Sequence, residues 1–204
     1  MPTVLDVPVI DAPPDDDGIS DELLPERYEV VHGKIVELPP MSDYARAVAN
    51  RLNNQFVRYL ATNDIGDSVV EILFRIPLRE DRSRNRQPDV AFVSYERWAR
   101  DRPHPFTGNP RNVVPDIAVE VVSPGDSADS LLEKAREYLR GGVRLVWVVY
   151  PLAREVHVYL PGAGTIRAFV AEEELDAGDI LPGFRTSVAA LFPPREEPTP
   201  VADE

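Results

Sequence analysis

The chain has 204 residues, which fits one domain with tails, and it contains no cysteine, which excludes a disulfide framework and a thiolate metal site. No apolar run is long enough to span a membrane, and the N-terminus has no signal-peptide pattern, so we expect a cytoplasmic protein. The net charge of −13 would disfavour nucleic acid as a partner if it were spread evenly.

The acidic charge is concentrated at the two ends of the chain. Residues 1–26 hold eight acids and no basic residue, and residues 193–204 hold four acids and one arginine. The ends therefore carry −8 and −3, which leaves −2 for residues 27–192. Both ends are also rich in proline and lack aromatic residues. We predict a disordered acidic arm at 1–24, one domain at 25–192 and a disordered tail at 193–204.

The first half of the domain predicts a hairpin, a helix and two strands. Short β-branched runs on either side of His32-Gly33 indicate the hairpin. Apolar residues at helical spacing predict a helix over 42–63, capped by Ser42 or Asp43. Residues 68–78 and 88–94 predict strands that are separated by a polar loop at 79–87, and a short helix is expected at 95–101.

The second half predicts a strand, a helix and three further strands. Residues 115–123 and 144–150 are apolar strands joined by a helix over 128–140, which favours a parallel, right-handed crossover. Residues 154–160 and 165–170 indicate an antiparallel pair. The predicted fold class is α/β, in an α+β form with a mixed β-sheet flanked by helices.

An acid lies inside the apolar strand at 115–123. Strand alternation puts Glu120 on one face with two apolar neighbours, and a lone buried carboxylate must be paired, protonated or bound to a cation. Asp89 is the neighbouring candidate, because Pro88 places it near the start of the strand before. Two carboxylates on adjacent strands suit Mg²⁺. A structural alternative, in which Asp89 caps a turn and Glu120 meets an arginine, stays open.

One of only two lysines follows the Glu120 strand. The chain has twenty arginines, so the use of lysine at position 134 suggests a need for a compact ammonium group. Lys134 is a candidate for positioning water or contacting a phosphate beside a metal. The alternative is an exposed helix residue beside Glu133 and Glu137.

A basic stretch leads into Asp89. Its arginines could hold a phosphate backbone, or they could lie in a solvated loop balanced by Glu80 and Asp81. The candidate nucleic-acid-binding residues are Arg75, Arg79, Arg82, Arg84 and Arg86.

The motifs together resemble those of the Uma-two family of endonucleases, in the PD-(D/E)XK nuclease superfamily. The matching stretches are "RYEVVHGKIVELPP", "RQPDVAFVSYERW", "VPDIAVEVVSPGDS", "EKAREYLRGGVRLVWVV" and "REVHVYLPG". The resemblance implies a restriction-endonuclease-like fold, Mg²⁺ or Mn²⁺ as cofactor, and DNA as partner. It implies that Asp89 and Glu120 bind the metal with the backbone carbonyl of Val121. The usual lysine position holds Val122 here, so the resemblance assigns that role to Lys134.

Three positions depart from the family pattern. His32-Gly33 replaces a frequent Asp-Gly, Tyr150-Pro151 replaces an acid-proline pair, and no histidine stands near Tyr44. The sequence is therefore compatible with two functions. One is a Mg²⁺-dependent endonuclease that cuts DNA, with Asp89, Glu120 and Lys134 as catalytic residues. The other is a catalytically inactive protein of the same fold that binds nucleic acid or protein. A homodimer and the roles of Asp116 and Glu71 are left open.

Overall fold

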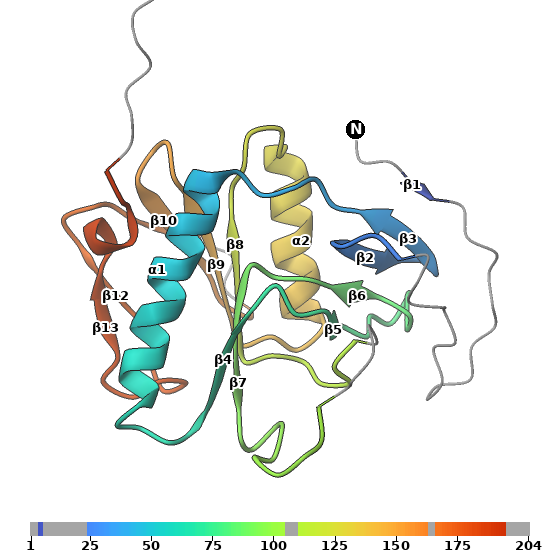
Figure 1. The fold of residues 1–204 in the computed structure, drawn as a ribbon, viewed down its shortest axis with the longest axis horizontal. Coiled ribbons are helices and arrows are strands. Elements are labelled where there is room, and N and C mark those ends of the chain that lie inside the picture. Colours follow the sequence, from blue (N-terminus) through green and yellow to red (C-terminus); the bar gives the residue numbers. More distant parts are fainter. Residues whose placement is uncertain (1–3, 6–23, 105–109, 163–165, 195–204) are drawn as a thin grey trace, which may run out of the picture.

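A computed structural model describes residues 4–5, 24–104, 110–162 and 166–194 of the chain. Its largest sheet has the strand order β11-β10-β9-β8-β7-β4 (Figure 1). The bounds are β4 (Gly66–Val70), β7 (Val90–Ser94), β8 (Ile117–Val121), β9 (Leu145–Tyr150), β10 (Glu155–Tyr159) and β11 (Arg167–Phe169). Strands β8 and β9 are parallel and all other neighbours are antiparallel, so the predicted mixed sheet is confirmed.

Two smaller sheets complete the strands. One has the order β1-β3-β2-β6-β5, and the other pairs β12 with β13. Their bounds are β1 (Val4–Leu5), β2 (Tyr28–Val31), β3 (Lys34–Glu37), β5 (Phe74–Arg75), β6 (Asn85–Arg86), β12 (Glu174–Asp176) and β13 (Arg185–Ser187). A 3-10 helix, η2 (Val188–Leu191), follows β13. None of the helices in the described ranges is long and apolar enough to cross a membrane.

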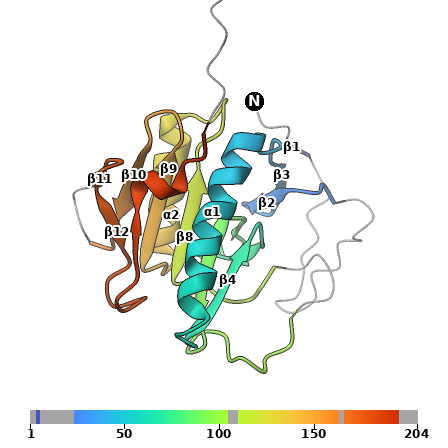
Figure 2. The same ribbon diagram turned by 60° about the vertical axis from the view of Figure 1, so that its left-hand side comes forward.

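The two α-helices cover opposite faces of the six-stranded sheet (Figures 1 and 2). Helix α1 (Asp43–Leu60) begins at its N-cap Ser42, whose hydroxyl accepts a hydrogen bond from the backbone N–H of Ala45. Helix α2 (Ala128–Arg140) begins in the same way at Ser127 and ends at Gly141. Both helices were predicted from spacing and caps. Helix α2 connects β8 to β9, which gives the parallel pair its crossover.

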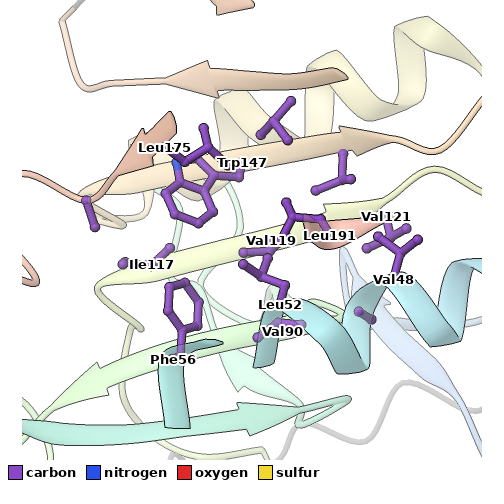
Figure 3. Packing of buried hydrophobic residues seen from close by; sticks show 14 of the residues in the cluster. Val48, Leu52, Phe56, Val90, Ile117, Val119, Val121, Trp147, Leu175 and Leu191 are labelled. Atoms are coloured by element: carbon purple, nitrogen blue, oxygen red, sulfur yellow. The ribbon is translucent and has the colours of Figure 1, made fainter. Parts of the chain in front are cut away.

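The alternation predicted for the Glu120 strand is confirmed. Ile117, Val119 and Val121 pack in the core on the α1 side, which includes Phe56 and Trp147 (Figure 3). The intervening positions of β8 face α2 and belong to a second core. Glu120 therefore points toward α2 from within an apolar layer.

The hairpin between β2 and β3 is also confirmed. Val31 pairs with Lys34, so the loop has only His32 and Gly33, with φ values of 51° and 71°. Two consecutive positive φ values give the turn that matches the twist of a hairpin. The backbone N–H of His32 donates to Asp81 Oδ2 at 2.7 Å, which ties the turn to the loop before β6.

The strand predicted at 68–78 is wrong in one respect, because two strands in different sheets replace it. The chain breaks at Glu71, whose φ is 49°, between β4 and β5. Residues far along the sequence stabilise the break. Glu71 N–H donates to the Asp89 carbonyl, and Gln87 Nε2 donates to the Glu71 carbonyl at 2.7 Å. The polar loop predicted at 79–87 contains β6, and the short helix expected at 95–101 is a series of turns.

Most of the predicted acidic arm and tail lies outside the described residues. Within the arm, Val4 and Leu5 form β1, which pairs with β3, and so these two positions differ from the prediction. Disorder of the remaining arm and tail residues stays a prediction.

Candidate active site

Asp89 and Glu120 stand across from each other on adjacent strands. Val90 pairs with Val119 in the antiparallel β7–β8 ladder, so one step further along, Asp89 faces Glu120. The Asp89 backbone N–H donates to the Val119 carbonyl at 3.0 Å, and its Oδ2 accepts from the Val121 N–H at 2.7 Å. The Val121 backbone therefore lies directly beside the Asp89 carboxylate. Both acids are 5% exposed.

Glu120 is held by two side chains of α2. Tyr138 donates its hydroxyl to Oε1 at 2.7 Å, and the Lys134 ammonium donates to Oε2 at 2.9 Å. Lys134 and Tyr138 are four residues apart and lie on one face of the helix, which is why both reach the same carboxylate. The structure thus places the Lys134 ammonium on Glu120, whereas the side chain that contacts Asp89 is Arg27, just before β2.

Lys134 lies between two carboxylates. Its Nζ is 2.9 Å from Glu120 Oε2 and 3.0 Å from Oε1 of Glu29, which projects from β2. Burial alone would lower the pKa of Lys134, but the two carboxylates outweigh it and raise that pKa. Lys134 is therefore a stable ammonium. This arrangement suits electrostatic stabilisation and hydrogen-bond donation rather than proton abstraction.

Burial and nearby negative charges raise the pKa values of both acids. Burial, followed by the nearby charge of Glu120, raises the pKa of Asp89 to about 7. The pKa of Glu120 is also raised, mainly by burial and then by Glu29, although Lys134 and Tyr138 act against the shift. Burial therefore favours the neutral form of both acids, and a bound cation would favour the ionised form instead.

A chain of buried ion pairs extends from Lys134 into the small sheet. Glu29 contacts Arg86, Arg86 contacts Glu137 on α2, and Glu137 Oε1 lies 3.3 Å from Arg84 Nη1. Arg84 Nε lies in turn 2.9 Å from Asp81 Oδ2. We call this set the buried ion network; it joins β2, β6 and α2 beside the candidate site.

The basic stretch before Asp89 does not form one exposed surface. Arg84 and Arg86 are largely buried in the buried ion network, with side chains 5% and 11% exposed. Arg79 and Arg82 are exposed, and Arg75 is half-buried. The structure therefore separates two arginines of the stretch from any surface that could meet a phosphate backbone.

Four contributors to the site (Arg27, Glu29, Glu137 and Tyr138) were not found from the sequence, and Arg86 was considered only as a phosphate contact or a loop residue. Of these, Glu137 and Tyr138 could have been found, because they follow Lys134 at the three- and four-residue spacing of one helix face. Glu29 and Arg86 pair across 57 residues, which no local pattern reveals. Arg27 follows the acidic arm directly and is far from the predicted site in the sequence. Its Nη2 donates to Asp89 Oδ1 at 3.1 Å.

The two acids with open roles have different surroundings. Asp116 begins β8 at the end away from Glu120; it accepts from Ser94 N–H at 2.8 Å and lies 3.0 Å from Arg97 Nε. Its contacts are those of a structural anchor. Glu71 lies beside Asp89 instead, with its oxygens 3.1 Å from Arg27 Nε and 2.9 Å from Arg46 Nη1.

The donor set of Asp89 and Glu120 suits a hard cation. Each of the four carboxylate oxygens has one hydrogen-bond partner in the contacts above, whereas an ionised carboxylate offers about four lone-pair sites. Mg²⁺ accepts one or two carboxylates and completes its shell with water. Within the described ranges, no three His, Asp or Glu side chains form a metal-binding cluster. The candidate ligands are Asp89, Glu120 and the Val121 carbonyl.

Comparisons with known proteins agree with this fold. A search of curated proteins gives no match. A solved structure described as "a putative nuclease belonging to DUF820 from Anabaena variabilis ATCC 29413" superposes with a TM-score of 0.69 at 18% identity. The match covers 81% of this chain and 89% of that one, and at this identity it shows the fold alone. The family model Uma2, described as "Putative restriction endonuclease", matches residues 21–189, and the chain belongs to this family.

Proposed function

We propose that the protein is a Mg²⁺-dependent endonuclease that hydrolyses phosphodiester bonds of DNA in the cytoplasm. One observation carries the proposal: Asp89 and Glu120 face each other on adjacent strands, with the Lys134 ammonium 2.9 Å from Glu120. Membership of the Uma2 family and the fold of the Anabaena protein support the same reaction class.

The residues of the site divide the work between binding and orientation. Asp89, Glu120 and the Val121 carbonyl would hold Mg²⁺, or Mn²⁺ in its place. When bound, the ion supplies charge stabilisation at the phosphate and a water of lowered pKa. Lys134 provides a fixed positive charge for the negative charge that develops on the phosphate oxygens. Tyr138 orients Glu120, and Glu29 orients Lys134.

Metal binding can be measured without knowing the substrate sequence. We expect calorimetry to show that the wild type binds one or two Mn²⁺ or Mg²⁺ ions. The variant Asp89→Asn/Glu120→Gln should lose this binding, because it replaces both anionic ligands with neutral amides of similar size. Far-UV circular dichroism checks that the variant is folded. Equal binding by the two proteins would place the metal elsewhere.

The affinity for metal should depend on pH through Asp89. Burial and the Glu120 charge raise the pKa of Asp89 to about 7, and a carboxyl group must lose its proton before it binds the ion. Below pH 7, the affinity for Mn²⁺ should fall about tenfold per pH unit, and above pH 7 it should level off. Calorimetry from pH 5.5 to 8.0 tests this. An affinity that is constant between pH 5.5 and 7.0 would contradict it.

A second function is favoured by one observation, because both acids already contact cations of the chain itself. Arg27 lies on Asp89 and Lys134 on Glu120, as expected for a binding module without catalysis. That function predicts DNA binding without any thermal stabilisation by Mn²⁺. A rise in Tm with Mn²⁺ that disappears in Asp89→Asn would rule it out.

A further inference from the structure

Arg27 contacts one carboxylate oxygen of Asp89 at the edge of the candidate site. Its Nη2 lies 3.1 Å from Asp89 Oδ1 and its Nε lies 3.1 Å from Glu71 Oε1, so one guanidinium group bridges two carboxylates. Its Nη1 donates to the Pro39 carbonyl at 3.0 Å. The side chain is only 15% exposed. All three guanidinium nitrogens are therefore engaged at the edge of the candidate site.

The backbone of Arg27 is fixed independently of its side chain. The Arg27 carbonyl accepts a hydrogen bond from Leu38 N–H at 3.0 Å, which ties the residue to the end of β3. Arg27 directly precedes β2, which supplies Glu29 to the buried ion network. Rotation of the arginine side chain away from Asp89 would leave this backbone hydrogen bond intact.

An arginine and a divalent ion cannot both contact this carboxylate without cost. Two positive charges a few ångströms apart repel each other strongly in a buried site, where the effective dielectric constant is far below that of water. The ion would bind the Asp89 carboxylate, and Arg27 already contacts one of its two oxygens. Glu71 keeps Arg46 as a second partner, at 2.9 Å, so it remains paired if Arg27 leaves.

We propose that Arg27 is a built-in counter-ion that competes with the divalent cation for Asp89 and restrains metal loading of the site. This inference rests on the proposed function, since it assumes that Asp89 binds metal. In the metal-free protein Arg27 bridges Asp89 and Glu71. In the loaded protein its guanidinium leaves Asp89 and retains the Pro39 carbonyl and solvent as partners.

The test compares Arg27→Gln with Arg46→Gln, using Mn²⁺ alone as the probe at pH 8. Both variants remove one arginine from Glu71, but only Arg27→Gln removes the contact with Asp89. We expect Arg27→Gln to bind Mn²⁺ about tenfold or more tightly than the wild type, because one competing charge is gone. Arg46→Gln should stay within about twofold of the wild type, because its side chain is half-exposed and does not contact Asp89.

The possible outcomes separate this inference from the proposed function. If the wild type binds Mn²⁺ and Arg27→Gln binds it equally or more weakly, the proposed competition is wrong, but the metal site remains supported. Binding by Arg27→Gln but not by the wild type supports the competition and shows that the resting protein excludes metal. Binding by neither protein, with both folded by circular dichroism, overturns both ideas.

A measurement on the wild type covers the case in which Arg27→Gln does not fold. Nitrogen-15 NMR of arginine side chains reports each guanidinium, with Arg27→Lys used to assign the Arg27 signal. Titration with diamagnetic Mg²⁺ should shift the Arg27 Nε signal and speed its hydrogen exchange, while the signal of Arg97, at Asp116, stays constant. An unchanged Arg27 signal at saturating Mg²⁺ would overturn the proposal.

Discussion

Replacing Glu120 with glutamine should reduce Mg²⁺-dependent nicking of supercoiled DNA at least about a hundredfold, because metal catalysis supplies several kcal/mol. The amide keeps the shape of the side chain but loses the charge that would bind the ion. The fold should survive, since Tyr138 can still donate to the amide oxygen and Lys134 retains Glu29. Gel assays of plasmid nicking measure the rate, and thermal unfolding checks the fold.

Glu133→Gln is the matched control for this experiment. Glu133 lies on α2 next to Lys134, but it is exposed. The Glu133→Gln substitution changes the net charge by the same amount without altering the site. This variant should nick DNA at the wild-type rate. A Glu120→Gln protein that is folded and equally active would remove Glu120 from the mechanism.

Replacing Glu137 with alanine should lower the free energy of unfolding by about 3–5 kcal/mol, the range for breaking a buried ion pair. Glu137 is 2% exposed, and it contacts Arg84 and Arg86 of the buried ion network. Its loss would leave two largely buried guanidinium groups short of a partner and a cavity on α2. We expect a fall in Tm of roughly 10 °C in thermal unfolding.

The control for this prediction is again on α2. Glu133→Ala removes an acid from the exposed side of the same helix and should change the free energy of unfolding by less than about 0.5 kcal/mol. If Glu137→Ala were no more damaging than Glu133→Ala, the buried ion network would contribute little to holding β6 against α2.

The elements with strong local patterns were predictable from the sequence. The alternation around Glu120 and the capped helices α1 and α2 depend on residues within one or two turns of each other. The division of 68–78 between β4 and β5 was not predictable. It depends on Glu71 being held by Gln87, 16 residues away, and β6 is only two residues long.

The candidate site shows the same contrast between local and distant contacts. Asp89, Glu120 and Lys134 stood out because an acid in an apolar strand and a rare lysine are visible in the chain itself. Arg27 and Glu29 were missed because their partners Asp89 and Arg86 lie 62 and 57 residues away. The arginine stretch was a candidate phosphate contact because its charge is visible, whereas Glu29 and Glu137, which pair with Arg86, come from other elements.

The buried ion network has a consequence for the order in which the protein acquires its structure. Arg86 must find Glu29, 57 residues before it, and Glu137, 51 residues after it, so these contacts close large loops. A chain emerging from the ribosome also contains Asp89 and Glu120 before it contains helix α2, which supplies Lys134 and Tyr138. Until α2 docks, Glu120 lacks both of its side-chain partners. We expect the complete site to form only in a late folding step, so that unfinished chains do not carry a working nuclease.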